Sequence, residues 1–128
     1  MKVKIMANCF CGANSSFEEC CQIYLSGTQH APTAETLMRS RYSAYATGNA
    51  DYLVATTHSS TRKLHKKIAI LEWSKSNHWI KLEVLYSTET TVKFKAYYLD
   101  YRGIDQVHEE LSTFVFENGK WYYVDGEY

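Results

Sequence analysis

All four cysteines of the 128-residue chain lie in one short window, as two pairs separated by eight residues. A disulfide framework would distribute its cysteines so that each bridge closes a long loop, and this window cannot do that. Four thiolates this close in sequence can instead converge on one tetrahedral ion, and zinc is the usual metal of an all-sulfur site. The spacing therefore predicts a metal site with zinc as the expected ion, iron as the alternative, and as ligands Cys9, Cys11, Cys20 and Cys21.

Other interpretations of this window stay open. The thiols could form a redox cluster, or they could be four small buried apolar side chains. Adjacent Cys20 and Cys21 have poor geometry for a disulfide, and Cys-x-Cys is not the usual spacing of an oxidoreductase. Catalytic zinc is not favoured, because four sulfur ligands leave no open coordination position. The sequence therefore favours a structural site, and it assigns no catalytic residue.

The segment around the cysteines has the composition of a folded loop followed by a helical turn. Gly12 and Asn14, between the two pairs, tolerate the left-handed backbone that a loop around an ion requires. Residues 17–25 are compatible with a short helix that ends near Gly27. A curled loop and a helical turn can bring both pairs to one ion.

Length and charge limit the classes of protein to consider. A chain of 128 residues fits one domain, or one domain with a small metal-held segment attached. The formal net charge is zero, which argues against general nucleic-acid binding. No apolar run approaches the roughly twenty residues that span a bilayer, and the first eight residues lack the apolar core of an export signal. We expect a cytoplasmic protein with no membrane segment, in which thiols stay reduced and available to metal.

The first half of the chain has helical signals. Thr33 is a candidate N-cap for a helix over residues 34–47, which Gly48 ends. Asn49 can cap a second helix over residues 51–56, and residues 63–76 predict a third, amphipathic helix. The first helix has one face formed by Leu37, Met38, Arg41, Tyr42 and Tyr45. Arg41 needs a carboxylate or carbonyl partner on that face, unless its charged end reaches water, and both alternatives stay open.

After residue 78 the apolar period changes from helical to alternating. Strands are expected over residues 79–86, 92–98, 104–117 and 121–125. Asn118-Gly119 is a strong signal for a two-residue hairpin, which would pair Phe116 with Trp121, Phe114 with Tyr123, and Ser112 with Asp125. Helices followed by an antiparallel meander indicate an α+β domain with the helices packed on one face of the sheet.

Several strings of residues resemble a known family. The cysteine window is similar to the SEC-C metal-binding motif at the C-terminus of the translocation ATPase SecA. Together with residues 32–35, 37–45 and 121–126, and with His58, residues 60–62, Trp79, His108-Glu109, Ser112 and Phe114, the chain resembles the bacterial YchJ family. The resemblance implies a SEC-C segment over residues 1–27 and a nuclear-transport-factor-2-like domain over residues 28–128. In that fold a curved antiparallel sheet and its helices form a cone.

The chain departs from the usual SEC-C pattern between the cysteines. Phe10 stands where that motif has proline, and no lysine lies between the two pairs. All four ligand positions are present, so the expectation of metal binding is unaffected. The missing lysines weaken any inference of contacts with an acidic chaperone or with ribosomal RNA, because charge would drive both.

Two functions are consistent with these patterns, and the sequence favours the first, with the second as its alternative. The first is protein recognition, in which the metal-held segment presents Phe10, Phe17 and Tyr24 to a partner from the translation or secretion machinery. The second is a small-molecule or enzymatic pocket inside the cone. Its candidate residues are Arg41, Tyr45, His58, Arg62, Trp79, His108, Glu109, Ser112, Trp121, Tyr123 and Asp125. A buried polar cluster that satisfies Arg41 is the structural alternative to such a pocket.

Overall fold

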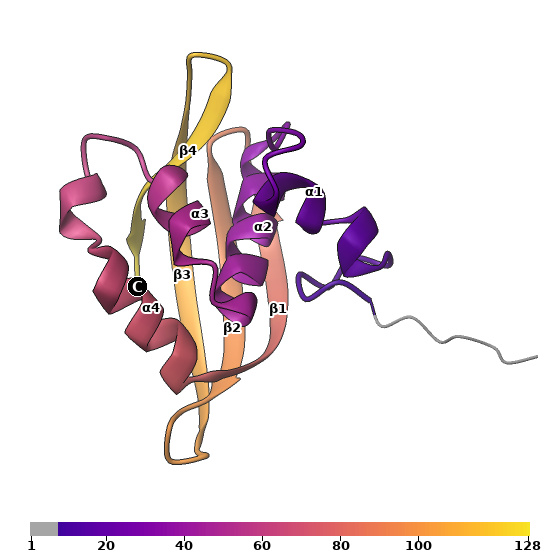
Figure 1. The fold of residues 1–128 in the computed structure, drawn as a ribbon, viewed down its shortest axis with the longest axis vertical. Coiled ribbons are helices and arrows are strands. Elements are labelled where there is room, and N and C mark those ends of the chain that lie inside the picture. The colour runs from indigo at the N-terminus through magenta and orange to yellow at the C-terminus, as the bar shows by residue number, and fades with distance from the viewer. Residues whose placement is uncertain (1–7) are drawn as a thin grey trace, which may run out of the picture.

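The computed structural model describes residues 8–128, so the first seven residues, on which the expectation about an export signal rests, lie outside it. Figure 1 shows an α+β fold in which helices cross one side of an antiparallel sheet. In chain order the elements are η1 (Phe17–Glu19), α1 (Gln22–Leu25), α2 (Ala34–Thr47), α3 (Ala50–Ala55), η2 (Arg62–Leu64), α4 (Lys67–Ser76), β1 (His78–Ser87), β2 (Thr91–Leu99), β3 (Asp105–Glu117) and β4 (Lys120–Glu127). None of the helices in residues 8–128 has the length and apolar character that crossing a bilayer requires.

Helices α2 and α3 begin and end at the predicted signals. The Thr33 side chain accepts a hydrogen bond from the backbone N–H of Thr36, which satisfies one of the free donors at the start of α2. Gly48 ends α2 in the left-handed conformation, at a φ of 76°, and Asn49 caps α3 by accepting from the backbone of Tyr52. The prediction of a helix over residues 34–47 is confirmed.

The third predicted helix is shorter than expected. Residues 62–64 form one 3-10 turn, the backbone is extended at Lys66, and α4 begins only at Lys67. The break turns the His65 ring toward Tyr123, with 5.9 Å between the ring centroids. Leu64 and Ile68 are consequently exposed, at 73% and 63%, so the apolar face that defined the longer helix is not a buried face.

The sheet is a meander with strand order β1-β2-β3-β4. Asn118 and Gly119 both have positive φ, and the predicted pairs Phe116 with Trp121 and Phe114 with Tyr123 are confirmed. The predicted pairing of Ser112 with Asp125 is wrong. The register shifts between Thr113 and Phe114, which pair with Asp125 and Tyr123, so Val124 of β4 is the inserted residue and Ser112 lies opposite Gly126.

A second irregularity lies in β1, between Trp79 and Lys81. It leaves Ile80 exposed at 52%, whereas Trp79 packs against the core and Leu82 is buried. Strict alternation along the predicted strand over residues 79–86 places Ile80 and Leu82 together on the opposite side from Trp79. The bulge corrects that assignment, because an inserted residue reverses the faces on one side of it.

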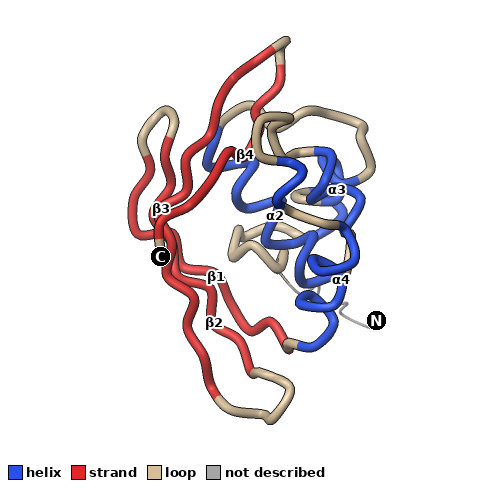
Figure 2. Tube along the Cα trace, turned by 90° about the vertical axis from the view of Figure 1, so that its left-hand side faces the viewer, coloured by secondary structure: helices blue, strands red, loops and turns tan. Residues whose placement is uncertain are grey.

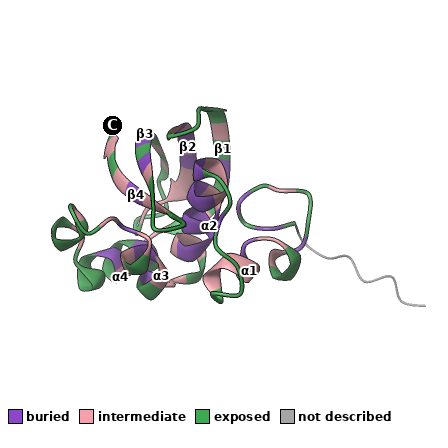
Figure 3. Cartoon of the chain, turned by 90° about the horizontal axis from the view of Figure 1, so that it is seen from above, coloured by how far each residue is buried: buried purple, intermediate pink, exposed green. Residues whose placement is uncertain are grey.

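The sheet curves, and its concave face looks toward the helices (Figure 2). Helix α2 supplies Leu37 and Met38 to a core that also contains Val92 and Phe94 of β2 and Phe114 of β3. The same buried cluster continues into the N-terminal segment through Cys9, Cys11 and Cys21. Figure 3 shows α2 largely buried between that segment and the sheet. Helix α2 thus positions both the cysteines and the interior of the cone.

Candidate functional site

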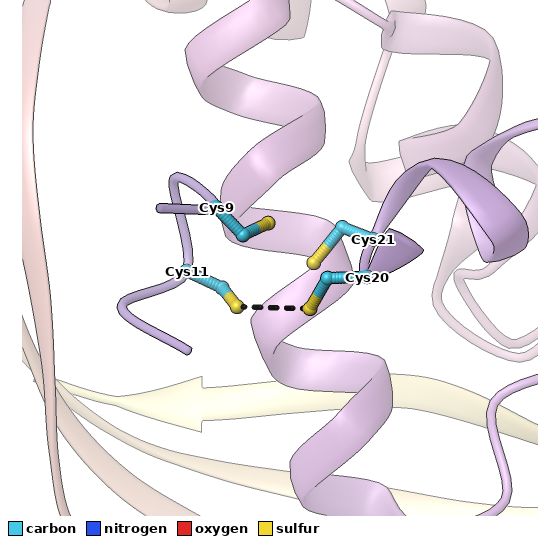
Figure 4. A group of neighbouring side chains, drawn as sticks. All are labelled: Cys9, Cys11, Cys20 and Cys21. Atoms are coloured by element: carbon cyan, nitrogen blue, oxygen red, sulfur yellow. Dashed lines mark hydrogen bonds between the residues drawn. The ribbon is translucent and has the colours of Figure 1, made fainter. Parts of the chain in front are cut away.

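The four cysteine side chains lie close together, with two from each side of one small cluster (Figure 4). All four Sγ atoms lie within 4.8 Å of one another, and those of Cys11 and Cys20 are 3.7 Å apart. A tetrahedral zinc centre with Zn–S bonds of about 2.3 Å has sulfur–sulfur edges of about 3.8 Å. The donor set is all sulfur and largely buried, with Cys9, Cys11 and Cys21 enclosed and Cys20 half-buried. The cluster therefore fits a closed metal site.

Local backbone structure brings the two pairs together. The N–H of Cys9 donates to the Ser15 carbonyl at 2.6 Å, and the N–H of Gly12 donates to the Cys9 carbonyl at 3.0 Å. These bonds curl the loop so that Cys9 and Cys11 face one direction. Gly12 has a φ of +89°, which a side chain would disfavour. The second pair lies between η1 and α1, where Cys21 immediately precedes the first residue of α1.

Side chains of helix α2 contact this loop and hold it in place. Arg39 Nη1 donates to the Cys11 carbonyl at 2.7 Å, and Arg39 Nε donates to Glu35 at 3.0 Å. The Ser43 hydroxyl lies 3.7 Å from the Cys9 sulfur. Such contacts around a ligand shell orient the ligands and tune the metal. They also fix the N-terminal segment to the helix that lines the cone.

The thiols interact strongly with one another. A hydrogen bond from Cys21 lowers the pKa of Cys11 to about 5. Burial, together with the charge on Cys11, raises the pKa of Cys20 to about 12, and the hydrogen bond to Cys11 raises the pKa of Cys21. A thiolate on Cys11 thus disfavours deprotonation of the neighbouring thiols. A cation at the centre removes that repulsion and allows several thiolates to coexist.

The second candidate site is a cavity of about 230 Å³ inside the cone. It lies among α2, α4 and the concave face of the sheet, and most of its wall is aromatic. The lining residues are Met38, Arg41, Tyr42, Tyr45, His65, Ile70, Trp73, Trp79, Phe94, Ala96, His108, Glu110, Ser112, Phe114, Tyr123 and Tyr128. An apolar cavity with a few converging polar groups is the usual form of a small-molecule site.

Arg41 is the cation of this cavity, and it is only 7% exposed. Its Nη1 donates to the Leu53 carbonyl at 2.9 Å and to the hydroxyls of Thr56 and Thr57 at 2.7 and 3.4 Å. The guanidinium carbon lies 4.5 Å from the centroid of the Tyr123 ring, a cation–π distance. Burial lowers the pKa of Arg41, but a guanidinium remains protonated in proteins.

Glu110 is the buried anion of the cavity. Its carboxylate accepts from the Nε2 of His108 at 2.8 Å, from the Ser112 hydroxyl, and from the Tyr123 hydroxyl at 3.0 Å. Burial opposes ionisation, but these hydrogen bonds outweigh it and lower the pKa of Glu110. An ionised carboxylate only accepts, so His108 Nε2 carries a proton and, in the neutral ring, Nδ1 is the acceptor.

The structure brings six of the predicted pocket residues to the cavity wall, namely Arg41, Tyr45, Trp79, His108, Ser112 and Tyr123. Five others lie elsewhere. His58 pairs with Glu117 at 2.9 Å, and Arg62 donates to the Thr57 carbonyl at 3.0 Å. Trp121 donates to the Pro32 carbonyl at 3.2 Å and lines a separate groove beside α3.

The remaining two differ from expectation for reasons of strand geometry. Glu109 points to the outer face of the sheet, where it pairs with Lys93 at 3.2 Å, since neighbours on a strand alternate. Asp125 is exposed, because the extra residue Val124 in β4 places Gly126 opposite Ser112 instead. The carboxylate partner of His108 is therefore Glu110, two residues along β3.

Some residues that line the cavity were not among the pocket residues predicted from the sequence. Glu110 carries a usable signal, because it shares the period of two with His108 and Ser112. His65 and Trp73 had no such signal, since the break before α4 decides where they face. Tyr128 reaches the cavity beside His108, with 4.9 Å between the ring centroids.

We expect the free energy of unfolding to fall on acidification, partly through Glu110. Its folded pKa is below its ordinary value of 4.5, so its contribution is complete above that pH and is lost as pH falls through the folded pKa. Glu110→Gln should lower stability near neutral pH, and its difference from wild type should shrink in acid. Urea unfolding across pH measures this, with the exposed Glu109→Gln as control. A difference that stays constant down to acid pH would contradict the assignment.

Gly126 is needed because of Glu110. A Cβ on residue 126 would overlap the Glu110 carboxylate and its neighbouring carbons. Gly126→Ala should therefore displace that carboxylate from its donors and lower the free energy of unfolding by about 2 kcal/mol. Chemical denaturation checks the effect. In a Glu110→Ala background the same substitution should cost much less, and an equal cost there would show that the overlap is not the cause.

Known proteins match both the helix-and-sheet part of the chain and nearly the whole chain. Residues 33–126 match the family model of the YchJ middle NTF2-like domain. A UPF0225 protein of Vibrio parahaemolyticus is 39% identical over 95% of this chain and 75% of its own, and one of Streptomyces coelicolor is 42% identical over 94% of each. The solution structure of a SEC-C motif containing protein from Rhodopseudomonas palustris superposes with a TM-score of 0.87 at 36% identity, covering 94% of this chain and 98% of the other.

A crystal structure of a SEC-C motif containing protein from Psychrobacter arcticus superposes with a TM-score of 0.78, also at 36% identity, over 91% of this chain and 80% of the other. These matches include both the cysteine segment and the cone, and they confirm the resemblance inferred from the sequence. The chain therefore belongs to the UPF0225 (YchJ) family, with a SEC-C-type cysteine cluster joined to an NTF2-like domain.

Proposed function

We propose that the protein binds a small molecule inside the cone and that its cysteine cluster holds a structural zinc ion. The observation that carries the first part is the buried Arg41, whose Nε and Nη2 have no hydrogen-bond acceptor within residues 8–128. Both atoms are partly accessible. Among residues 8–128, Ser16 Oγ is the one fully buried side-chain N or O atom without a hydrogen-bond partner, so Nε and Nη2 of Arg41 are not fully buried. Because Arg41 lines the cavity, these donors are available to a ligand there.

Zinc is supported by the donor set. Four sulfur ligands that already lie near tetrahedral spacing suit a closed structural site, in which zinc contributes folding energy and performs no reaction. Reduced thiols are also what a cytoplasmic protein retains, and we place the protein there. Elemental analysis of untagged protein purified under reducing conditions should give about one zinc per chain. Iron in its place, or no metal at all, would refute this part of the proposal.

The binding function is tested by crystallographic screening with a library of small fragments. We expect density in the cavity beside Arg41 and Trp79 for the wild-type protein. The matched variant is Ala96→Leu, because Ala96 is buried on β2 and lines the cavity, so a larger side chain there narrows it. Density confined to the groove beside Trp121, or equal occupancy in wild type and variant, would refute the cavity as the binding site.

A second candidate function is protein recognition by the N-terminal segment. Phe10 is 47% exposed and packs edge to face on Phe17, with 5.3 Å between the ring centroids. Exposed aromatic side chains held by a rigid metal site are suitable anchors for a partner. By analogy with other SEC-C segments, the partner would belong to the translation or secretion machinery.

This candidate is tested by affinity capture from a cytosolic extract. Intact protein should retain a partner that metal-stripped protein and Phe10→Ser lose, while Ala96→Leu retains it. Identical capture by the intact, stripped and Phe10→Ser proteins would refute it. The use of Ala96→Leu separates this function from binding in the cone.

A further inference from the structure

The chemistry of the cavity indicates which class of small molecule it accepts, if the proposed binding function holds. Arg41 makes no ion pair with a carboxylate within residues 8–128, and it donates to one carbonyl and two hydroxyls. Burial lowers the pKa of Arg41, and the charge on Glu110, which is not bonded to it, offsets only part of that effect. A buried cation without a bonded anion is costly, so a ligand that supplies the anion is favoured.

The free donors of Arg41 also define the shape of that anion. Nε and Nη2 lie on the same edge of the guanidinium plane and point in parallel, whereas Nη1 is already occupied by Leu53, Thr56 and Thr57. A carboxylate accepts two parallel N–H bonds in this arrangement. Nε and Nη2 of Arg41 can therefore donate two parallel hydrogen bonds to one carboxylate group.

Glu110 argues against a cationic ligand. Its Oε1 is occupied by His108, and its Oε2 by Ser112 and Tyr123. An amine would have to displace these donors to reach the carboxylate. Protein donors thus already bond both oxygens of the Glu110 carboxylate, whereas two nitrogens of Arg41 have no acceptor within residues 8–128.

The aromatic side chains that line the cavity indicate what the apolar part of the ligand is. Trp79 packs within 5.7 Å of Tyr45 and within 4.9 Å of Trp73, measured between ring centroids, and all three line the cavity. Such a wall favours a flat, apolar ring, which can stack or pack edge to face. An apolar protein cavity of about 150 Å³ holds a benzene molecule, so 230 Å³ accepts one ring with a small substituent.

We propose that the cone binds a monocyclic aromatic carboxylate, with the carboxylate on Nε and Nη2 of Arg41 and the ring against Trp79. This proposal rests on the proposed binding function and narrows it to one chemical class. It assigns to Arg41 the role of anion anchor, in addition to its contacts with the end of α3.

Benzoate and close analogues test the assignment by NMR titration, read at the indole N–H signals of Trp73 and Trp79. Benzoate should bind saturably, and benzamide, of the same shape but uncharged, should bind about ten-fold more weakly or worse. Cyclohexanecarboxylate should also bind more weakly, because its ring is not flat. Inorganic phosphate should show no saturable shift.

Variants locate the contact. Arg41→Lys keeps the charge but loses the fork, so benzoate affinity should fall about ten-fold. Arg62→Lys is the matched control, because Arg62 lies outside the cavity, and it should bind as wild type does. Equal binding of benzamide and benzoate, unchanged affinity in Arg41→Lys, or absence of benzoate binding while other fragments occupy the cavity would overturn the class and leave the binding function standing. A cavity that accepts neither these probes nor any fragment would overturn both.

Discussion

Replacing Cys21 with serine, or removing the metal with a chelator, should release the N-terminal segment from α2 while the sheet stays folded. The segment has no core of its own, since its buried side chains are the cysteines and a few residues that pack on α2. We therefore expect its order to depend on a bound ion, since structural zinc binding in small peptides contributes about 10–16 kcal/mol to folding. Loss of one buried ligand should remove most of that contribution.

Amide hydrogen exchange measures this result directly. Protection should disappear at residues 9–32 and at the α2 positions beneath them, such as Arg39 and Ser43, which contact Cys11 and Cys9. Protection in β2 and β3 should persist. Ser15→Ala, an exposed change in the same loop, is the control and should behave as wild type. Full protection of the segment after metal removal would show that packing alone holds it.

The cysteine cluster was predictable because its signal is local. Four ligands within thirteen residues, with turn-forming residues between the pairs, define the site without knowledge of the rest of the fold. The hairpin at Asn118-Gly119 was equally local, because both central residues must have positive φ. The boundaries of α2 follow from Thr33 and Gly48 in the same way.

The cavity was only partly predictable, because single inserted residues decide which side chains face it. The inserted Val124 in β4 moves Asp125 out and sets Gly126 against Glu110, and the inserted Ile80 in β1 turns Trp79 inward. Alternation along a strand cannot show where such a bulge falls. The break before α4, which directs His65 to the cavity, likewise depends on tertiary packing against Tyr123.

Arg41→Met should lower the free energy of unfolding by about 3 kcal/mol, because it removes one charge from a buried interior that holds two. The substitution also removes the hydrogen bond to the Leu53 carbonyl and the cation–π contact with Tyr123. Thr57 still donates to the Leu53 carbonyl at 2.7 Å, so that acceptor keeps a partner. Most of the cost therefore comes from removing the positive charge across the cavity from the Glu110 carboxylate, which keeps its hydrogen bonds from His108, Ser112 and Tyr123.

A double-mutant cycle with Glu110→Gln separates this electrostatic cost from simple loss of packing. If charge across the cavity is the cause, the double variant should be more stable than the sum of the single effects predicts, by at least about 0.5 kcal/mol. Arg62→Met, at an exposed arginine that also bonds a carbonyl, is the control and should change stability by about 0.5 kcal/mol or less. Strict additivity in urea unfolding would mean that Arg41 acts as a clamp on α3 and not as the counter-charge of Glu110. In that case the cavity's anion and cation are independent, and each can be changed without affecting the other.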